Sequence, residues 1–279
     1  MAFLGQRNTL IVLKDAPPGL YLDGGELGEI LLPGDSIPKG AQPGDTLDVF
    51  LYRDSEDRLV ATTRAPIAMV GDFAGLRVTH VHPKIGAFLD WGLNKDLLLP
   101  IREQARRVQQ GETVVVFILI DPKTDRVIAT SRWQEQLDFE TPTYAEGEKV
   151  ALLIAAETPL GYNAIVNNKQ LGLLYRSEIG STLKIGEKRE GYIRAIRADG
   201  KIDLRLDQEG YRRVAPLADQ ILDALKAAGG TLPVSDASSP ETIRDAFQVS
   251  KKAFKQALGN LYRQRLINIE GETIHLASP

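Results

Sequence analysis

Aromatic and basic residues gather between Lys149 and Leu206 in a pattern that suits binding to a single-stranded nucleic acid. Aromatic rings stack on bases, and cations beside them neutralise phosphates. The basic residues surround Ala198-Asp199-Gly200, which is typical of a hairpin turn. An alternative stays open, in which a tyrosine fills a core and the arginines form a solvated rim. The candidate residues are Tyr162, Tyr175, Arg194, Arg197, Lys201 and Arg205.

A second basic stretch runs from Ser250 to Arg265 and contains no acidic residue. It is predicted to be the second helix of a helix-turn-helix, the element that enters the major groove in DNA-binding proteins. Gly259 in its interior costs about 1 kcal/mol relative to alanine and favours close packing of the helix against protein. Nucleic-acid binding and a structural or protein-binding helix both stay open. The candidate contacts are Lys251, Lys252, Lys255 and Arg263.

Both stretches belong to a chain with an internal repeat, and a fixed spacing repeated three times indicates repeated structural units. The copies begin at Gly19, Gly86 and Gly161. Fourteen positions later stand Pro33, Pro100 and Tyr175 (33 − 19 = 100 − 86 = 175 − 161). A second glycine follows 25 positions after the first, at Gly44, Gly111 and Gly186.

Each copy contains short β-branched and apolar runs separated by Gly, Pro and Asp, which predicts short strands. Five strands in about 60 residues suit the five-stranded barrel that binds oligonucleotides. A glycine that opens the second strand allows a close bend in such a barrel. The strands expected in the first copy are Thr9–Leu13, Leu20–Asp23, Glu29–Leu32, Thr46–Tyr52 and Arg58–Thr63.

The second copy carries a family resemblance. Its Gly86-Ala87-Phe88-Leu89-Asp90, followed by a Leu-Leu pair, resembles the S1 RNA-binding domain. The resemblance implies that Phe88, and Tyr21 in the first copy, are exposed rings that stack on nucleic acid. The position where the family has histidine holds Pro33, Pro100 or Tyr175, so one family contact is altered in the first two copies.

From Gly210 onward the hydrophobic period changes from 2 to 3.6. Leu217, Ile221 and Leu225 predict a helix that Gly229-Gly230 ends. Ser239 and Ser250 are the expected N-caps of two further helices. A hairpin is expected from Leu266 to Leu276, and three helices with a terminal hairpin form a winged helix.

The predicted fold is therefore mainly β and multi-domain, with three tandem five-stranded S1/OB-fold barrels and a C-terminal α+β winged helix. This architecture resembles the conserved virulence factor B family of bacterial proteins across nearly the whole chain. The resemblance implies a cytoplasmic, non-enzymatic RNA-binding protein that affects gene expression after transcription. The expected domains are residues 1–64, 65–134, 143–210 and 212–279, and the acidic segment 135–148 is expected either to link domains or to pack between them.

The chain has 279 residues and no cysteine, which excludes disulfides and fits a reducing cytoplasm. Its net charge of −3 gives no global attraction to nucleic acid. The charge is unevenly spread: the net is −4 over residues 1–64, −1 over 65–142, +1 over 143–208 and zero over 215–279. The apolar runs are seven residues long, too short for a membrane helix, so no membrane is expected as a partner.

No catalytic constellation, phosphate-binding loop or nucleophile elbow is recognisable, so neither an enzyme nor a cofactor is predicted. His80 and His82 share a strand face, and a structural or surface role is expected for them rather than a metal site. The predicted partner is single-stranded RNA. Two alternatives stay open: a DNA-binding transcription regulator, and a scaffold for ribosomal or RNA-processing proteins. The sequence specifies no protein partner.

Overall fold

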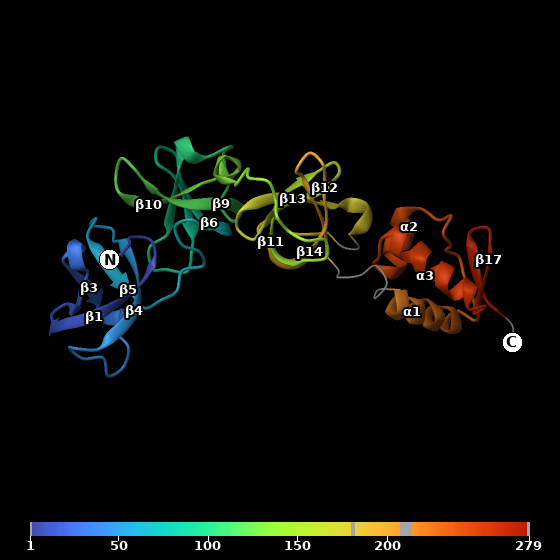
Figure 1. The fold of residues 1–279 in the computed structure, drawn as a ribbon, viewed down its shortest axis with the longest axis horizontal. Coiled ribbons are helices and arrows are strands. Elements are labelled where there is room, and N and C mark those ends of the chain that lie inside the picture. Colours follow the sequence, from blue (N-terminus) through green and yellow to red (C-terminus); the bar gives the residue numbers. More distant parts are fainter. Residues whose placement is uncertain (1, 180–181, 207–213, 278–279) are drawn as a thin grey trace. The chain divides into compact units, whose positions relative to one another are not determined.

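The structure is a computed structural model that describes residues 2–179, 182–206 and 214–277. It contains three closed five-stranded barrels and a C-terminal winged helix, which confirms the predicted fold class (Figure 1).

The first barrel has the strand order β1-β2-β3-β5-β4, with β3 parallel to β5 and every other pair antiparallel. The five strands agree with those expected from the first copy of the repeat. They are β1 (Arg7–Ala16), β2 (Gly19–Asp23), β3 (Glu29–Pro33), β4 (Thr46–Arg53) and β5 (Leu59–Thr62).

The second and third barrels repeat this order, as the sequence repeat requires. The second consists of β6 (Phe73–His82), β7 (Gly86–Asp90), β8 (Leu97–Pro100), β9 (Thr113–Asp121) and β10 (Arg126–Thr130). The third consists of β11 (Lys149–Thr158), β12 (Gly161–Val166), β13 (Gln170–Tyr175), β14 (Lys188–Ile196) and β15 (Ile202–Arg205). Short 3-10 turns join or follow the strands: η1 (Gly25–Leu27), η2 (Gly34–Ser36), η3 (Ile101–Glu103), η4 (Trp133–Gln136) and η5 (Arg176–Glu178).

The glycine that opens each copy is required because two backbones nearly touch there. A Cβ placed on Gly19, Gly86 or Gly161 would lie 2.2, 2.2 or 2.0 Å from a carbonyl oxygen of the neighbouring strand. Each glycine is paired across the sheet with the residue 14 positions later, respectively Pro33, Pro100 and Tyr175. The constant spacing therefore reflects one cross-strand pair that each barrel repeats.

The chain forms two compact units, residues 1–137 and 138–279. In the first unit the two barrels share a packed interface that the repeat did not predict. The ring of Phe50 packs edge-on against Trp91, with centroids 5.6 Å apart. Lys95 Nζ donates to the carbonyl oxygens of Arg53 and Asp54 at 2.9 and 2.7 Å, and burial lowers the pKa of Lys95.

Two ion pairs close this interface in a reciprocal way, since each barrel contributes one arginine and one aspartate. Arg53 of the first barrel binds Asp125 of the second at 2.7 Å. Asp57 of the first barrel accepts from Arg126 of the second at 2.9 Å, and this bond lowers the pKa of Asp57. These contacts join the first two barrels within one compact unit.

In the second unit, the segment after η4 is attached to the third barrel. Asp138 N donates to Lys169 O at 3.0 Å, and Gln170 Nε2 donates to Glu140 O at 2.7 Å. This part of the 135–148 segment is thus ordered structure, one of the two interpretations left open. The predicted boundary near residue 212 lies outside the described residues.

The winged helix consists of three helices and a three-stranded sheet of order β16-β18-β17. Ser239 accepts from Thr242 N at 3.1 Å and Ser250 from Ala253 N at 3.3 Å, which confirms both predicted N-caps. The elements are α1 (Val214–Ala227), β16 (Thr231–Leu232), α2 (Pro240–Phe247), α3 (Lys251–Arg263), β17 (Ile267–Glu270) and β18 (Thr273–Leu276). Among the described residues, no helix has the length and apolar character needed to span a membrane.

Candidate nucleic-acid interface

The structure brings one predicted tyrosine and two predicted arginines together at one end of the third barrel. Tyr175 ends β13, Arg194 lies in β14, and Arg197 follows that strand. The guanidinium carbons of Arg194 and Arg197 both lie 5.9 Å from the centre of the Tyr175 ring. We call these three residues the Tyr175 cluster.

Asp203, a residue that the sequence analysis did not select, holds the cluster in place. Its Oδ1 accepts from Arg197 Nε at 3.0 Å and from the Tyr175 hydroxyl at 3.2 Å. Arg197 also donates to the Tyr175 hydroxyl. Ring and guanidinium are thus fixed before any ligand arrives, which lowers the entropy lost on binding. A base can stack on the tyrosine ring or on a guanidinium plane.

The other candidates of the third barrel lie outside this cluster. Tyr162 is only 2% exposed and packs in the barrel core, so its ring offers no face to a base, contrary to the prediction. Lys201 Nζ pairs with Asp199 at 2.8 Å across the hairpin turn. Arg205 is half-buried, and its Nε has no hydrogen-bond partner among the described residues.

Strand register explains why the choice of Tyr162 was wrong. Tyr21 pairs with Leu31, Phe88 with Leu98, and Asn163 with Leu173, so these three pairs occupy equivalent positions. The third barrel therefore has Asn163 where the first two barrels have a ring. Its aromatic residue stands instead at Tyr175, where the others have proline. Counting two residues from each opening glycine identifies Asn163 from the sequence alone.

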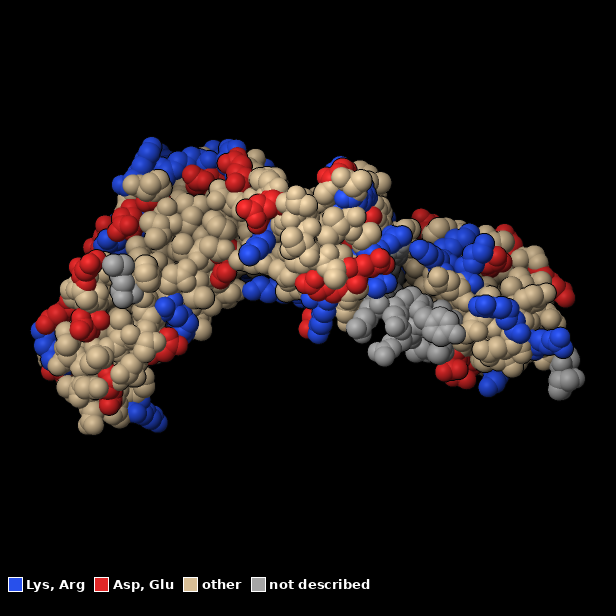
Figure 2. Space-filling view, viewed as in Figure 1, with Lys and Arg blue, Asp and Glu red and all other residues tan. Residues whose placement is uncertain are grey.

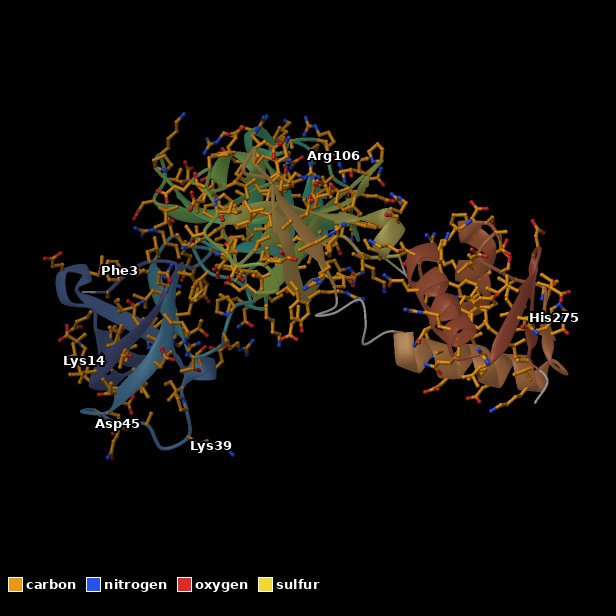
Figure 3. All side chains as sticks on the ribbon, turned by 45° about the vertical axis from the view of Figure 1, so that its right-hand side comes forward. Phe3, Lys14, Lys39, Asp45, Arg106 and His275 are labelled. Carbon is orange, nitrogen blue, oxygen red and sulfur yellow. The ribbon has the colours of Figure 1, made fainter. Side chains whose placement is uncertain are left out.

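The rings of the first two barrels are half-buried on the outer surface. Phe88 lies beside its cross-strand partner His80, with ring centres 6.1 Å apart. Lys14, marked on the first barrel in Figure 3, places its ammonium 4.9 Å from the centre of the Tyr21 ring. That ammonium also pairs with Glu29 at 2.5 Å, so its charge is largely compensated.

Replacing Phe88 with alanine is expected to weaken RNA binding while leaving the second barrel folded. The loss of one stacked base costs about 1–3 kcal/mol of binding. Leu89→Ala is the matched comparison, since Leu89 is fully buried and its truncation costs about 2–5 kcal/mol of stability. Urea unfolding and RNA titration of both variants check this. If Phe88→Ala destabilises the barrel as much as Leu89→Ala, the assignment of Phe88 to the binding face is wrong.

The cations of α3 have different roles. Lys251 Nζ donates to Ser238 O at 2.8 Å and so holds the loop before α2, which is a structural role. The Lys255 side chain is 68% exposed, and its ammonium lies 3.7 Å from a carboxylate oxygen of Asp236. Lys252 and Arg263 are exposed on the same helix. Figure 2 shows the lysine and arginine residues of the winged helix in blue.

Tyr262 on α3 was not selected from the sequence and is 56% exposed. The helical period of the sequence could have identified Tyr262 as exposed. Phe254, Leu258 and Leu261 form the buried side of α3, and Tyr262, next to Arg263, lies outside that side. Within the second unit, α3 also contacts η5, which directly follows Tyr175. Within this unit, the basic helix therefore lies beside the turn that follows Tyr175.

His80 and His82 lie in β6, where His82 Nδ1 accepts from Lys84 N at 3.3 Å. Over the ranges that the structure describes, no three His, Cys, Asp or Glu side chains are grouped so as to hold a metal ion.

Comparisons with known proteins match both domain types. Residues 4–64 and 70–132 match the S1 domain, and residues 219–276 match the CvfB-like winged helix domain. Conserved virulence factor B of Staphylococcus haemolyticus is 27% identical over 244 residues, covering 84% of this chain and 81% of that protein. The chain therefore contains S1 domains and a CvfB-like winged helix domain, and its relatives include proteins named conserved virulence factor B.

Two other relatives match a similar share of the chain. Conserved virulence factor B of Staphylococcus aureus is 26% identical over 242 residues, covering 84% of this chain and 80% of that protein. The uncharacterized protein YitL of Bacillus subtilis is 28% identical over 272 residues, covering 93% and 89%. A crystal structure of a multidomain protein with nucleic acid binding domains from Streptococcus pneumoniae is 22% identical and covers 98% of both chains, with a TM-score of 0.44.

Proposed function

We propose that this protein binds single-stranded RNA through its third barrel and winged helix and thereby regulates gene expression after transcription in the cytoplasm. The observation that carries the proposal is the Tyr175 cluster, a hydrogen-bonded ring with two guanidinium groups close to it, on a strand whose following turn η5 contacts the basic helix α3. Stacking rings beside cations are the recurring means of holding single strands. The proposed role needs neither a cofactor nor a catalytic residue.

The distribution of charge favours RNA binding by the third barrel and winged helix rather than by the first barrel. The first barrel has a net charge of −4, so phosphates approaching it meet like charge. The third barrel has a net charge of +1, and no acidic residue occurs between Ser250 and Arg265. Neutralising phosphates with lysine and arginine supplies most of the sequence-independent affinity for nucleic acid.

A salt titration tests the proposal. The full chain is expected to bind single-stranded RNA more tightly than duplex DNA of matched length. Residues 138–279 are expected to retain most of that affinity and residues 1–137 little. Because Lys251 holds a loop, charge is reversed at Lys252 and Lys255 instead, and this double variant is expected to bind more weakly with a flatter salt dependence. Tighter binding to duplex DNA, or an N-terminal fragment as tight as the full chain, would overturn the proposal.

A further inference from the structure

Gly259 lies inside α3, and no contact within the described ranges accounts for it. The helix runs unbroken from Lys251 to Arg263, and Gly259 is not among the residues with positive φ. A Cβ added there meets no heavy atom within 4 Å of the described structure, so the close helix packing suggested by the sequence is absent. A glycine inside a helix is less stable than an alanine. Gly259 therefore lowers the stability of the helix, and no packing contact from the part of the chain that the structure describes compensates for this.

Gly259 is the centre of the solvent-facing side of the helix. Residues three and four apart in a helix lie on one face. Lys255, Gln256, Tyr262 and Arg263 stand three or four residues from Gly259, and Lys252 stands three residues before Lys255. All five are exposed, while Phe254, Leu258 and Leu261 form the opposite, buried side. We call the exposed side the Gly259 face.

The chemistry of the Gly259 face matches a phosphate backbone. Arg263 Nε donates to Gly259 O at 3.1 Å, which folds the guanidinium over the bare helix backbone. The Lys255 side chain, 68% exposed and with its ammonium 3.7 Å from an Asp236 carboxylate oxygen, adds a second cation to this face. Tyr262, 56% exposed, adds a ring for stacking to the same face. A glycine lets a ligand come close to the main chain where any side chain would hold it away.

We infer that the Gly259 face binds the sugar-phosphate backbone of RNA in close contact with the helix main chain, and that the missing side chain at position 259 is what allows this contact. The inference rests on the proposed function and adds the residue that sets how closely RNA approaches α3. It accounts for a glycine that lowers the stability of its own helix.

The test uses Gly259→Ala and Gly259→Leu in the full chain, with labelled single-stranded RNA as the probe. Alanine is expected to raise the melting temperature of the winged helix by roughly 4–8 °C, because a better helix former replaces glycine without a clash. RNA binding is expected to fall in both variants, and by about tenfold with leucine, the larger side chain. Ala227→Leu, at the exposed end of α1, adds comparable bulk elsewhere and should bind like the wild type.

A more stable variant that binds RNA less well supports the inference, because stability and binding then move in opposite directions. Wild-type RNA affinity in both Gly259 variants overturns it, and the proposed function stands if Tyr175→Ala still weakens binding. Loss of duplex DNA affinity with RNA affinity intact also overturns it and assigns the face to DNA. A wild-type chain that binds no single-stranded RNA refutes the proposed function itself.

Discussion

Tyr175→Ala is expected to lower the affinity for single-stranded RNA by about 5- to 150-fold, the equivalent of about 1–3 kcal/mol for one stacked base. The ring lies close to both Arg194 and Arg197, so its loss removes the stacking surface and the contact that the two guanidinium groups share. A fluorescence titration at fixed salt measures the effect. The dependence of affinity on salt should change little, because no cation is removed.

Tyr175→Phe is the matched control for this variant. It keeps the ring but removes the hydroxyl that bonds to Asp203 and Arg197. Affinity close to wild type in the phenylalanine variant, with a large loss in the alanine variant, attributes the effect to stacking. Equal losses in both would show that the hydroxyl network, rather than the ring, is what matters. Wild-type affinity in both would remove the Tyr175 cluster from the binding surface.

Gly161→Ala is expected to destabilise the third barrel by about 3 kcal/mol or more. The added Cβ would lie 2.0 Å from Leu174 O and 2.7 Å from Arg176 N, both backbone atoms that move only with the strand. The φ of +152° is also one that side chains rarely adopt. Because Gly161 is the cross-strand partner of Tyr175, RNA binding is expected to fall as well. Hydrogen exchange of the β12 and β13 amides locates the loss of structure.

Gly200→Ala in the same barrel is the control that distinguishes a steric clash of the new Cβ from the cost of an unfavourable backbone conformation. Gly200 has φ +77°, and a Cβ there meets no atom within 4 Å. The cost of a left-handed alanine alone is about 1–2 kcal/mol. A Gly161 variant no less stable than the Gly200 variant would show that the two strands can separate at little cost. The repeated glycine would then need another explanation.

The two alternative functions predict different results for these variants. A transcription regulator that reads duplex DNA through α3 would lose affinity on charge reversal at Lys255 but not on Tyr175→Ala. A protein scaffold would show little affinity for either nucleic acid, and all of these substitutions would leave that unchanged. The pattern across the variants therefore distinguishes the functions more sharply than any single affinity.

The sequence alone determined the architecture, because the signals involved are local or repeat at fixed intervals. The S1 resemblance implied that Phe88 faces outward, and in the structure Phe88 is half-buried whereas its neighbour Leu89 is fully buried. The constant spacing from the opening glycine to the proline or tyrosine corresponds to one cross-strand pair in each barrel. Serine caps and the change of period to 3.6 fixed the helices of the winged helix, since caps and amphipathic faces depend on neighbours within one or two turns.

Tertiary structure decided what each candidate side chain does, because its partners come from other strands and loops. Tyr162 is core and Tyr175 is surface, a difference that depends on the pairing of β12 with β13. Asp203 reaches Tyr175 only because β15 lies beside β13. From the sequence, Lys251 could not be distinguished from the neighbouring lysines. In the structure, its ammonium donates to the carbonyl oxygen of Ser238, 13 residues away. Composition records which charges are present, but only the fold determines which of them are already paired.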